Sequence, residues 1–158
     1  MALPVAKLVG LAVILGVGAV PVALTQSLDR LPGPFHAVVT RIIDGDTVEV
    51  TVPVWLGQTV TTNVRIEGID TPELRGKCEA ERVLAAAARD RLAALIGDGP
   101  VILTDVRYDK FGGRVVARLA DAQGADAGLV LVSEGLARPF DGRGARLSWC
   151  PVEDVSAG

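Results

Sequence analysis

The stretch TVEVTV, residues 47–52, alternates apolar and polar side chains with a period of two. That period predicts a β-strand whose three valines share one buried face. Asp-Gly-Asp at residues 44–46 predicts a tight turn before the strand, in which Gly45 takes a positive φ. The β-branched run at 36–44 and the alternating run at 59–68 predict a strand on each side. The domain is therefore expected to begin with three consecutive antiparallel strands.

The period changes to that of a helix in CEAERVLAAAARDRLAALIG, residues 78–97. Two further strands are predicted at 101–108 and 114–121, followed by a short helix at 126–137 with Asp126 as its N-cap. Three strands, a helix, two strands and a helix is an order that matches an OB-fold. We therefore predict a five-stranded β-barrel with α-helices, an α+β fold. The long helix is expected to end at Gly97 and to bury a stripe made of Ala80, Leu84, Ala88, Leu92 and Leu95.

Residues 8–24 are seventeen uncharged, mostly apolar residues that follow Lys7. They predict an export signal cleaved after Ala19 or near Ala23. The alternative is an uncleaved membrane anchor, at the short edge of the roughly 20 residues that cross a bilayer. Both alternatives place the rest of the chain outside the cytoplasm, in a periplasmic or extracellular location. The predicted divisions are a signal peptide or anchor at 1–27, a linker at 28–35, the barrel domain at 36–150 and a tail at 151–158.

The formal net charge is −3. Proteins that hold nucleic acid by bulk electrostatics are usually basic, so a nucleic-acid role here requires a local site with a metal cation to supply positive charge. We expect the chain to be a monomer, with membrane contact only through its N-terminal segment if that segment is uncleaved.

Acidic residues gather around the predicted third strand. Asp46 follows the Asp-Gly-Asp turn, and Asp70 lies in RIEGIDTPELRG, residues 65–76, in a turn that Pro72 makes rigid. If the strands pair as hairpins, both acids converge at one rim of the barrel. Two carboxylates and a backbone carbonyl suit Ca²⁺, and the absence of nearby His or Cys argues against zinc or copper. Glu73 is placed beyond the ion, where it could take a proton from water.

Arg65 adds a planar guanidinium that can bind two phosphate oxygens at once. A metal, a base and an arginine are the groups that in-line attack of water on a phosphodiester requires. Each residue alone also has an ordinary structural interpretation. Asp46 could be a turn residue, Asp70 a turn cap, Glu73 a solvated acid and Arg65 a surface ion-pair partner. Their combination, in this order, favours the catalytic interpretation.

Four blocks of the chain resemble the staphylococcal nuclease family, also called thermonucleases. The blocks are IIDGDTVEV (42–50), VRIEGIDTPE (64–73), YDKFGGRVVARL (108–119) and SEGLARP (133–139). The resemblance spans nearly all of residues 36–140. It implies an OB-fold that hydrolyses DNA and RNA with Ca²⁺ and leaves a 5′-hydroxyl and a 3′-phosphate.

The resemblance also implies roles for individual residues. Asp46 and Asp70 match the calcium carboxylates, Thr71 the residue whose carbonyl also binds the ion, and Glu73 the general base. Arg65 and Arg114 match the phosphate-binding arginines, and Lys110 and Phe111 the cation and aromatic beside the nucleotide.

Two features depart from the family pattern. The family has one glycine before the second arginine, whereas this chain has Gly112 and Gly113, so Arg107 and Arg118 are alternatives to Arg114. The family's nucleotide-contacting tyrosines after the last helix are also missing. Their candidate substitutes are Phe140, Arg143 and Trp149.

Cys78 and Cys150 are the two cysteines. In an exported chain an even count predicts a disulfide, and two independent thiols are the alternative. The bridge would tie the unpatterned segment RPFDGRGARLSWC, residues 138–150, to the start of the long helix. Arg138, Arg143 and Arg146 in that segment form either a basic patch for a nucleic-acid backbone or a solvated loop.

The sequence therefore predicts an exported Ca²⁺-dependent nuclease. The alternative is a non-catalytic OB-fold module that binds nucleic acid or protein, with or without a membrane tether.

Overall fold

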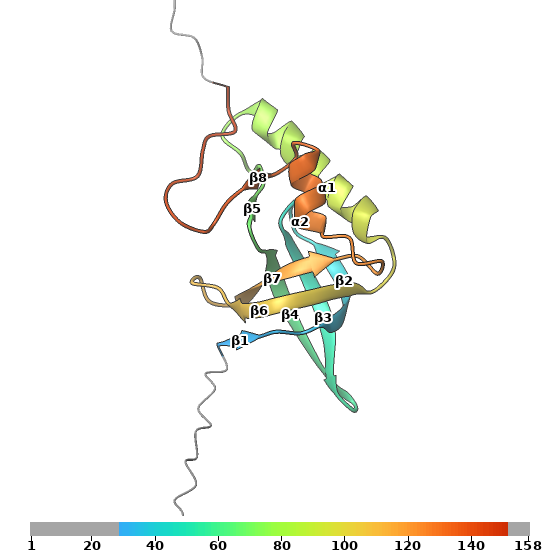
Figure 1. Cartoon of the computed structure of the whole chain (residues 1–158). Helices are drawn as coiled ribbons and strands as arrows, with labels where there is room; N and C mark the ends of the chain where they lie inside the picture. The colour runs from blue at the N-terminus through green and yellow to red at the C-terminus, as the bar shows by residue number, and fades with distance from the viewer. Residues whose placement is uncertain (1–28, 152–158) are drawn as a thin grey trace, which may run out of the picture.

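The computed structural model describes residues 29–151 of the chain (Figure 1). The predicted signal or anchor and residues 152–158 of the predicted tail lie outside the described residues. Within them the strands are β1 (Arg30–Leu31), β2 (Phe35–Ile42), β3 (Thr47–Trp55), β4 (Gln58–Ile66), β5 (Ile69–Asp70), β6 (Val101–Tyr108), β7 (Arg114–Ala120) and β8 (Arg138–Pro139). The helices are α1 (Glu79–Ile96) and α2 (Ala127–Ser133).

Five strands, β2, β3, β4, β6 and β7, close into a barrel. The sheet runs β6-β2-β3-β4-β7, and β7 pairs with β6 again, which closes the ring. The β4–β7 pairing is parallel, and the other pairings of the ring are antiparallel. A closed barrel leaves no long unpaired edge. The predicted five-stranded barrel with α-helices is confirmed as an α+β architecture compatible with an OB-fold.

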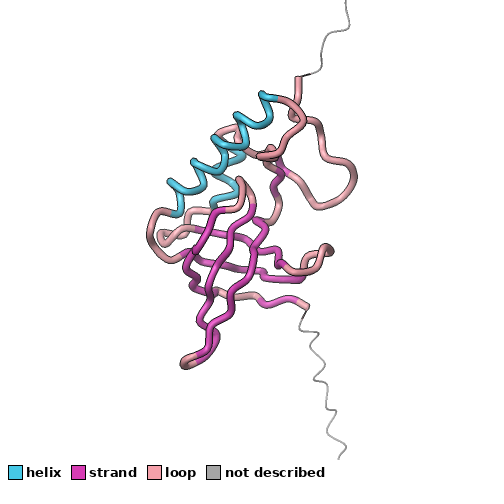
Figure 2. Tube along the Cα trace, turned by 180° about the vertical axis from the view of Figure 1, so that it is seen from behind, coloured by secondary structure: helices cyan, strands magenta, loops and turns pink. Residues whose placement is uncertain are grey.

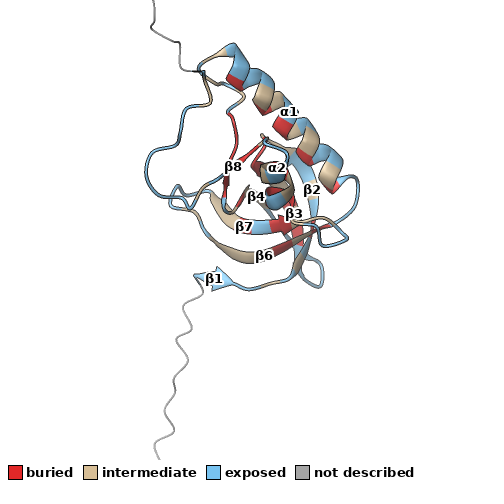
Figure 3. Ribbon diagram, turned by 45° about the horizontal axis from the view of Figure 1, so that its top comes forward, coloured by how far each residue is buried: buried red, intermediate tan, exposed pale blue. Residues whose placement is uncertain are grey.

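The barrel interior is built from the alternating residues that the sequence predicts. Val48 and Val50 of β3 are completely buried, and Val52 is 8% exposed. They pack with Val64 and Ile66 of β4 and with apolar residues of the other strands. Both helices lie at one end of the barrel, with the buried side of α1 toward it (Figure 3). The short helix begins as predicted, because Asp126 Oδ1 accepts a hydrogen bond from Leu129 N.

The predicted bounds of α1 are correct, but its predicted buried stripe is only partly correct. Ala88 and Leu92 are buried as predicted, and the other three residues are not. Gly97 ends the helix with φ 54°. Ala80 is exposed, and Leu84 and Leu95 are only half-buried. A run of four alanines offers several stripes of similar hydrophobicity, so contact with the barrel and not periodicity selects the face. The buried residues are Glu81, Ala85, Ala88, Leu92 and Ile96. Neither described helix is long and apolar enough to cross a bilayer.

Several segments differ from the predicted organisation. The short helix ends at Ser133 and not at residue 137, and Arg138–Pro139 of the segment predicted without a pattern form β8. The predicted linker contains β1, in which Arg30 and Leu31 pair with Arg107 and Val106 of β6. β3 is also longer than the predicted strand at 47–52, because it continues through Pro53 to Trp55. The β3–β4 hairpin turns at Leu56 and Gly57 and projects from the barrel at the end away from the helices (Figure 2).

Candidate active site

The turn before β3 lies against α1 and the segment after β5. Gly45 has no positive φ, contrary to the prediction. It is needed for a different reason, because a Cβ at this position would lie 2.8 Å from Ala88 Cβ and 3.1 Å from Thr71 Cβ. Asp44 Oδ1 accepts a hydrogen bond from Asp46 N, which fixes the turn. The missing Cβ therefore lets the turn pack directly against Ala88 and Thr71.

Asp46 is 3% exposed and has partners for both carboxylate oxygens. Thr47 Oγ1 donates to Asp46 Oδ1 at 2.8 Å, and Arg65 Nη1 lies 2.6 Å from Asp46 Oδ2. The register of β3 against β4 pairs Thr47 with Arg65, which explains why the guanidinium reaches the turn. Burial raises the pKa of Asp46 to about 6, although the charge of Arg65 opposes that increase.

Asp70 lies on the other side of the same arginine. It is 4% exposed, and β8 holds its strand by pairing Arg138 with Asp70. Arg65 Nη2 is 3.9 Å from Asp70 Oδ1, so one guanidinium lies near both buried aspartates. The two acids therefore converge at one rim of the barrel.

The Asp70 carboxylate also has an unusual set of contacts. Trp149 Nε1 donates to Oδ2 at 3.3 Å. Arg146 Nε lies 3.1 Å from Oδ1, but this buried oxygen accepts no well-oriented hydrogen bond. Arg146 therefore contributes charge but not a directed bond. A buried carboxylate oxygen that accepts no directed hydrogen bond is costly even beside two guanidinium groups, and a cation would satisfy it.

The oxygen ligands present fit a hard cation such as Ca²⁺. Asp46 and Asp70 supply carboxylates, and buried Thr71 lies between the turn and β5. Within residues 29–151, the one group of three acidic, His or Cys ligand atoms that all lie within 4.8 Å of one another is Cys78, Glu81 and Cys150. Both sulfurs of that group form a disulfide, so it offers no thiolate for a metal. A cation at the two aspartates would need further oxygens from the backbone or water.

Glu73 lies at the mouth of this site, with 54% of its side chain exposed. Arg146 Nη1 is 2.6 Å from Glu73 Oε1, so Arg146 bridges Glu73 and Asp70. Burial lowers the pKa of Arg146, but the charges of Asp70 and Glu73 outweigh that effect and raise it. Arg146 therefore keeps a positive charge in contact with Glu73, the predicted general base.

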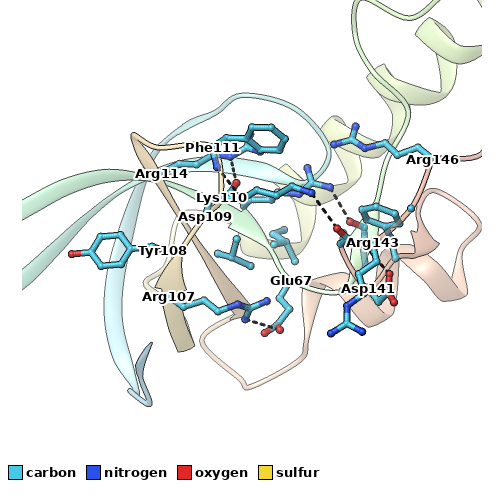
Figure 4. Close-up of a pocket in the computed structure, with 18 residues that line it drawn as sticks. Glu67, Arg107, Tyr108, Asp109, Lys110, Phe111, Arg114, Asp141, Arg143 and Arg146 are labelled. Atoms are coloured by element: carbon cyan, nitrogen blue, oxygen red, sulfur yellow. Dashed lines mark hydrogen bonds and ion pairs between the residues drawn. The ribbon is translucent and has the colours of Figure 1, made fainter. Parts of the chain in front are cut away.

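A cleft of about 660 Å³ begins beside Arg65 (Figure 4). Arg114 lines it and forms an ion pair with Asp109, and its guanidinium lies 5.6 Å from the Phe111 ring centroid. The parallel register pairs Asn63 with Arg114, which places Arg114 on the strand beside Arg65. Gly112 and Gly113 lie in the turn before Arg114, where Gly113 takes φ 78°.

The remaining cleft residues include the other predicted contacts. Lys110 Nζ donates to the Gly142 carbonyl at 3.2 Å, and Phe111 is 60% exposed. Arg107 also lines the cleft but is paired with Glu67 at 2.6 Å. Arg118 does not line it and lies 3.8 Å from Asp126. The cleft therefore excludes Arg118. Arg107 and Arg114 both line it with an acidic partner, and Arg114 is favoured because it lies on β7, the strand that pairs with the β4 strand of Arg65.

The segment after β8 is fastened over the two aspartates. The predicted disulfide between Cys78 and Cys150 is confirmed. Arg138 stacks on Trp149 with its Cζ 3.7 Å from the ring centroid, and it donates to Ser148 O at 3.0 Å. The three arginines of the predicted basic patch thus have different surroundings. Arg138 supports Trp149, Arg146 contacts the acids, and Arg143 lines the cleft.

Sequence reasoning did not place Arg146 or Trp149 on Asp70. The signal that could have found them is the cysteine pair. Trp149 precedes Cys150 directly, and Cys78 follows Glu73 by five residues. A bridge between those cysteines brings both segments to the same place.

No protein-family model matches this chain, and no curated protein matches it either.

Proposed function

We propose that this chain is an exported, Ca²⁺-dependent nuclease that hydrolyses the phosphodiester bonds of DNA or RNA. The proposed fold is the OB-fold of the staphylococcal nuclease type, whose motifs the chain resembles. The observation that carries the proposal is the position of Arg65. Its guanidinium lies near two buried aspartates and also lines a cleft that presents Arg114, Lys110 and Phe111.

Asp46, Asp70 and the backbone carbonyl of Thr71 would hold the cation. When bound, Ca²⁺ would supply positive charge to the phosphoryl oxygens and favour ionisation of a water molecule. The ligands are oxygens held in buried positions, which matches the preference of calcium.

The side chains of the chain itself have three tasks in this proposal. Glu73 accepts the proton of the attacking water, for which its exposed carboxylate is suited. Arg65 and Arg114 bind the phosphate, and their charge counts most when the attacked phosphorus group gains negative charge. Lys110 contacts a neighbouring phosphate, and the exposed ring of Phe111 stacks on a base.

Arg146 must release Glu73 before this carboxylate can act as a base. The contact is between charged side chains that are both more than a third exposed, so its breakage costs little. The disulfide keeps Arg146 near the acids, where the released guanidinium can meet a phosphate.

The test is digestion of single-stranded DNA and of RNA by the purified chain with Ca²⁺ and then with a chelator. We expect degradation that stops on chelation, with products that carry 5′-hydroxyl and 3′-phosphate ends. Asp70→Asn should abolish the activity, because it removes one of the two buried carboxylates. Asp98→Asn is the matched control, because Asp98 is an exposed acid outside the site. Full activity of Asp70→Asn would overturn the proposal.

A non-catalytic binding module is the second candidate. Arg146 favours it, because this arginine already contacts both Asp70 and the predicted base. The same digestion reports on this alternative when binding is followed in parallel. A band shift of single-stranded DNA without degradation, at any Ca²⁺ concentration, would support the module.

A further inference from the structure

The outer half of the β3–β4 hairpin has a composition unlike the rest of the surface. Residues 50–64 contain no charged side chain. Four apolar residues of this stretch are exposed, with Trp55 at 77% and Leu56 at 90%, beside Val54 and Val60. Exposed tryptophan and leucine at a loop tip cost free energy in water, because apolar surface stays hydrated.

The backbone conformation of the hairpin keeps these residues exposed. Its strands stay paired to the end, with Pro53 opposite Thr59 and Trp55 opposite Gln58. Gly57 takes φ 71°, and nothing lies within 4 Å of the position of its missing Cβ. The tip therefore projects as a narrow, ordered ribbon and does not fold back onto the barrel.

The hairpin tip lies at the same end of the barrel as the first described strand, which follows the apolar N-terminal sequence. The tip and β1 both lie at the end of the barrel away from α1 and α2 (Figures 1 and 2). Arg30 in β1 is only six positions after Leu24, the end of the apolar sequence at 8–24, with five residues between them. Six extended residues span about 20 Å, so an uncleaved anchor would hold this end of the barrel within about 20 Å of a bilayer.

We propose that the β3–β4 hairpin tip inserts into the interfacial region of a phospholipid bilayer, with Trp55 and Leu56 as the inserted side chains. Tryptophan suits the interface, where its ring is apolar and its indole N–H is hydrated. The lack of charge on residues 50–64 means that the contact needs no anionic lipid. A second copy of the chain is a poorer occupant, because four side chains on a ribbon offer less than the roughly 800 Å² per partner of a standard interface.

Insertion in this orientation leaves the candidate active site accessible. Lys110 and Phe111 lie on the β6–β7 connection and Arg146 on the segment after β8, none of which belongs to the hairpin. The proposal does not depend on nuclease activity, because the tip contributes no residue to the cleft.

The two tryptophans provide a matched pair of probes, because Trp55 and Trp149 are the only ones in the chain. The full chain is reconstituted with vesicles of phosphatidylcholine, with and without brominated acyl chains. In Trp149→Phe, we expect the emission of Trp55 to shift to the blue, to be quenched by the brominated lipid and to be shielded from aqueous iodide. The quenching should be equal at low and high salt. In Trp55→Phe, the emission of Trp149 should be unaffected by the brominated lipid.

A second variant tests the role of the tip itself. Leu56→Asp in the Trp149→Phe background should abolish lipid quenching of Trp55, because a charge at the tip resists insertion. Far-ultraviolet circular dichroism checks that each variant is folded. Three results would overturn the proposal. The first is quenching of Trp55 by iodide and not by brominated lipid. The second is shielding of Trp55 from both quenchers, which a contact with protein would cause. The third is lipid quenching of Trp55 that persists in Leu56→Asp.

Discussion

At the rim beside α1, Asp46 and Asp70 are 3% and 4% exposed, whereas at the tip of the β3–β4 hairpin Trp55 and Leu56 are 77% and 90% exposed. The rim buries charge and the tip exposes apolar surface. Both arrangements cost free energy in a protein surrounded only by water and its own atoms. A small barrel has little stability to spare. The two external components proposed above, a cation with a phosphate at the rim and lipid at the tip, would each offset one of these costs.

The protein reduces the free-energy cost of the buried charge at the rim, but not that of the exposed apolar surface at the tip. At the rim, Arg65 and Arg146 place positive charge beside the acids. At the tip, nothing within the described residues covers Trp55, and no charge lies on the hairpin around it. Substitutions should therefore have large effects at the rim and small effects on the isolated protein at the tip.

The largest effect is expected for Arg65→Ala. Activity should fall by about 10³-fold, because in the proposed mechanism the guanidinium stabilises the transition state. Unlike an exposed arginine, Arg65 also balances a buried carboxylate, so the free energy of unfolding should fall by about 3 kcal/mol. Initial rates and denaturant titrations measure the two effects. Arg118→Ala is the control, because this arginine is exposed and lies outside the cleft. If Arg65→Ala and Arg118→Ala have the same free energy of unfolding, an unbalanced buried carboxylate at the rim is not costly.

Removal of the disulfide should weaken the protein by a comparable amount. Cys78 and Cys150 are separated by 72 residues, and a bridge over such a loop contributes about 4 kcal/mol. We expect the double variant Cys78→Ser, Cys150→Ser to lose that stability in chemical denaturation. A reducing agent should destabilise the original protein and leave the double variant unchanged. A loss below about 1 kcal/mol would mean that the rest of the fold already orders residues 138–150.

Arg146→Ala is expected to have a smaller effect, and this substitution should favour calcium-dependent activity where the previous two weaken the protein. If Ca²⁺ binds at Asp70 as proposed, this arginine competes with it, so its removal should lower the Ca²⁺ concentration for half-maximal activity by about five-fold, roughly 1 kcal/mol. The measurement is a calcium titration of the rate at saturating substrate. Arg143→Ala is the matched control from the same segment, because it lines the cleft and has no ion pair with Asp70. An unchanged or higher calcium requirement in Arg146→Ala would contradict the competition.

The smallest effect is expected at the tip. The double variant Trp55→Ser, Leu56→Ser should keep its activity on a dissolved substrate, and its free energy of unfolding should change by no more than about 0.5 kcal/mol. Exposed side chains have few contacts to lose. Thermal unfolding and the digestion assay, both without lipid, measure this. A large destabilisation would show that the tip is part of the folded core and would remove the contrast between the two regions.

Much of the fold could be predicted from local patterns. The alternation at residues 47–52 predicted the buried face of β3, and Gly97 and Asp126 marked the end of α1 and the start of α2. These features depend on periods and caps within a few residues, which a single sequence displays. The backbone of Gly45 was predicted wrongly, and the stripe of α1 was predicted correctly only at Ala88 and Leu92. Both depend on contact with a surface formed by distant residues.

The candidate site shows the same division. The sequence by itself determined which acids and arginines the chain has, and the strand pattern predicted that Asp46 and Asp70 meet at one rim. Only the tertiary structure decided that Arg146 bridges Asp70 and Glu73 and that Trp149 donates to Asp70. Arg146 is 73 residues from Glu73 in the sequence, and Trp149 is 79 residues from Asp70. Residues 138–150 have no period of their own. Their position follows from the bridge to Cys78 and from charges brought together by the closed barrel, which are properties of the folded chain and not of any local stretch.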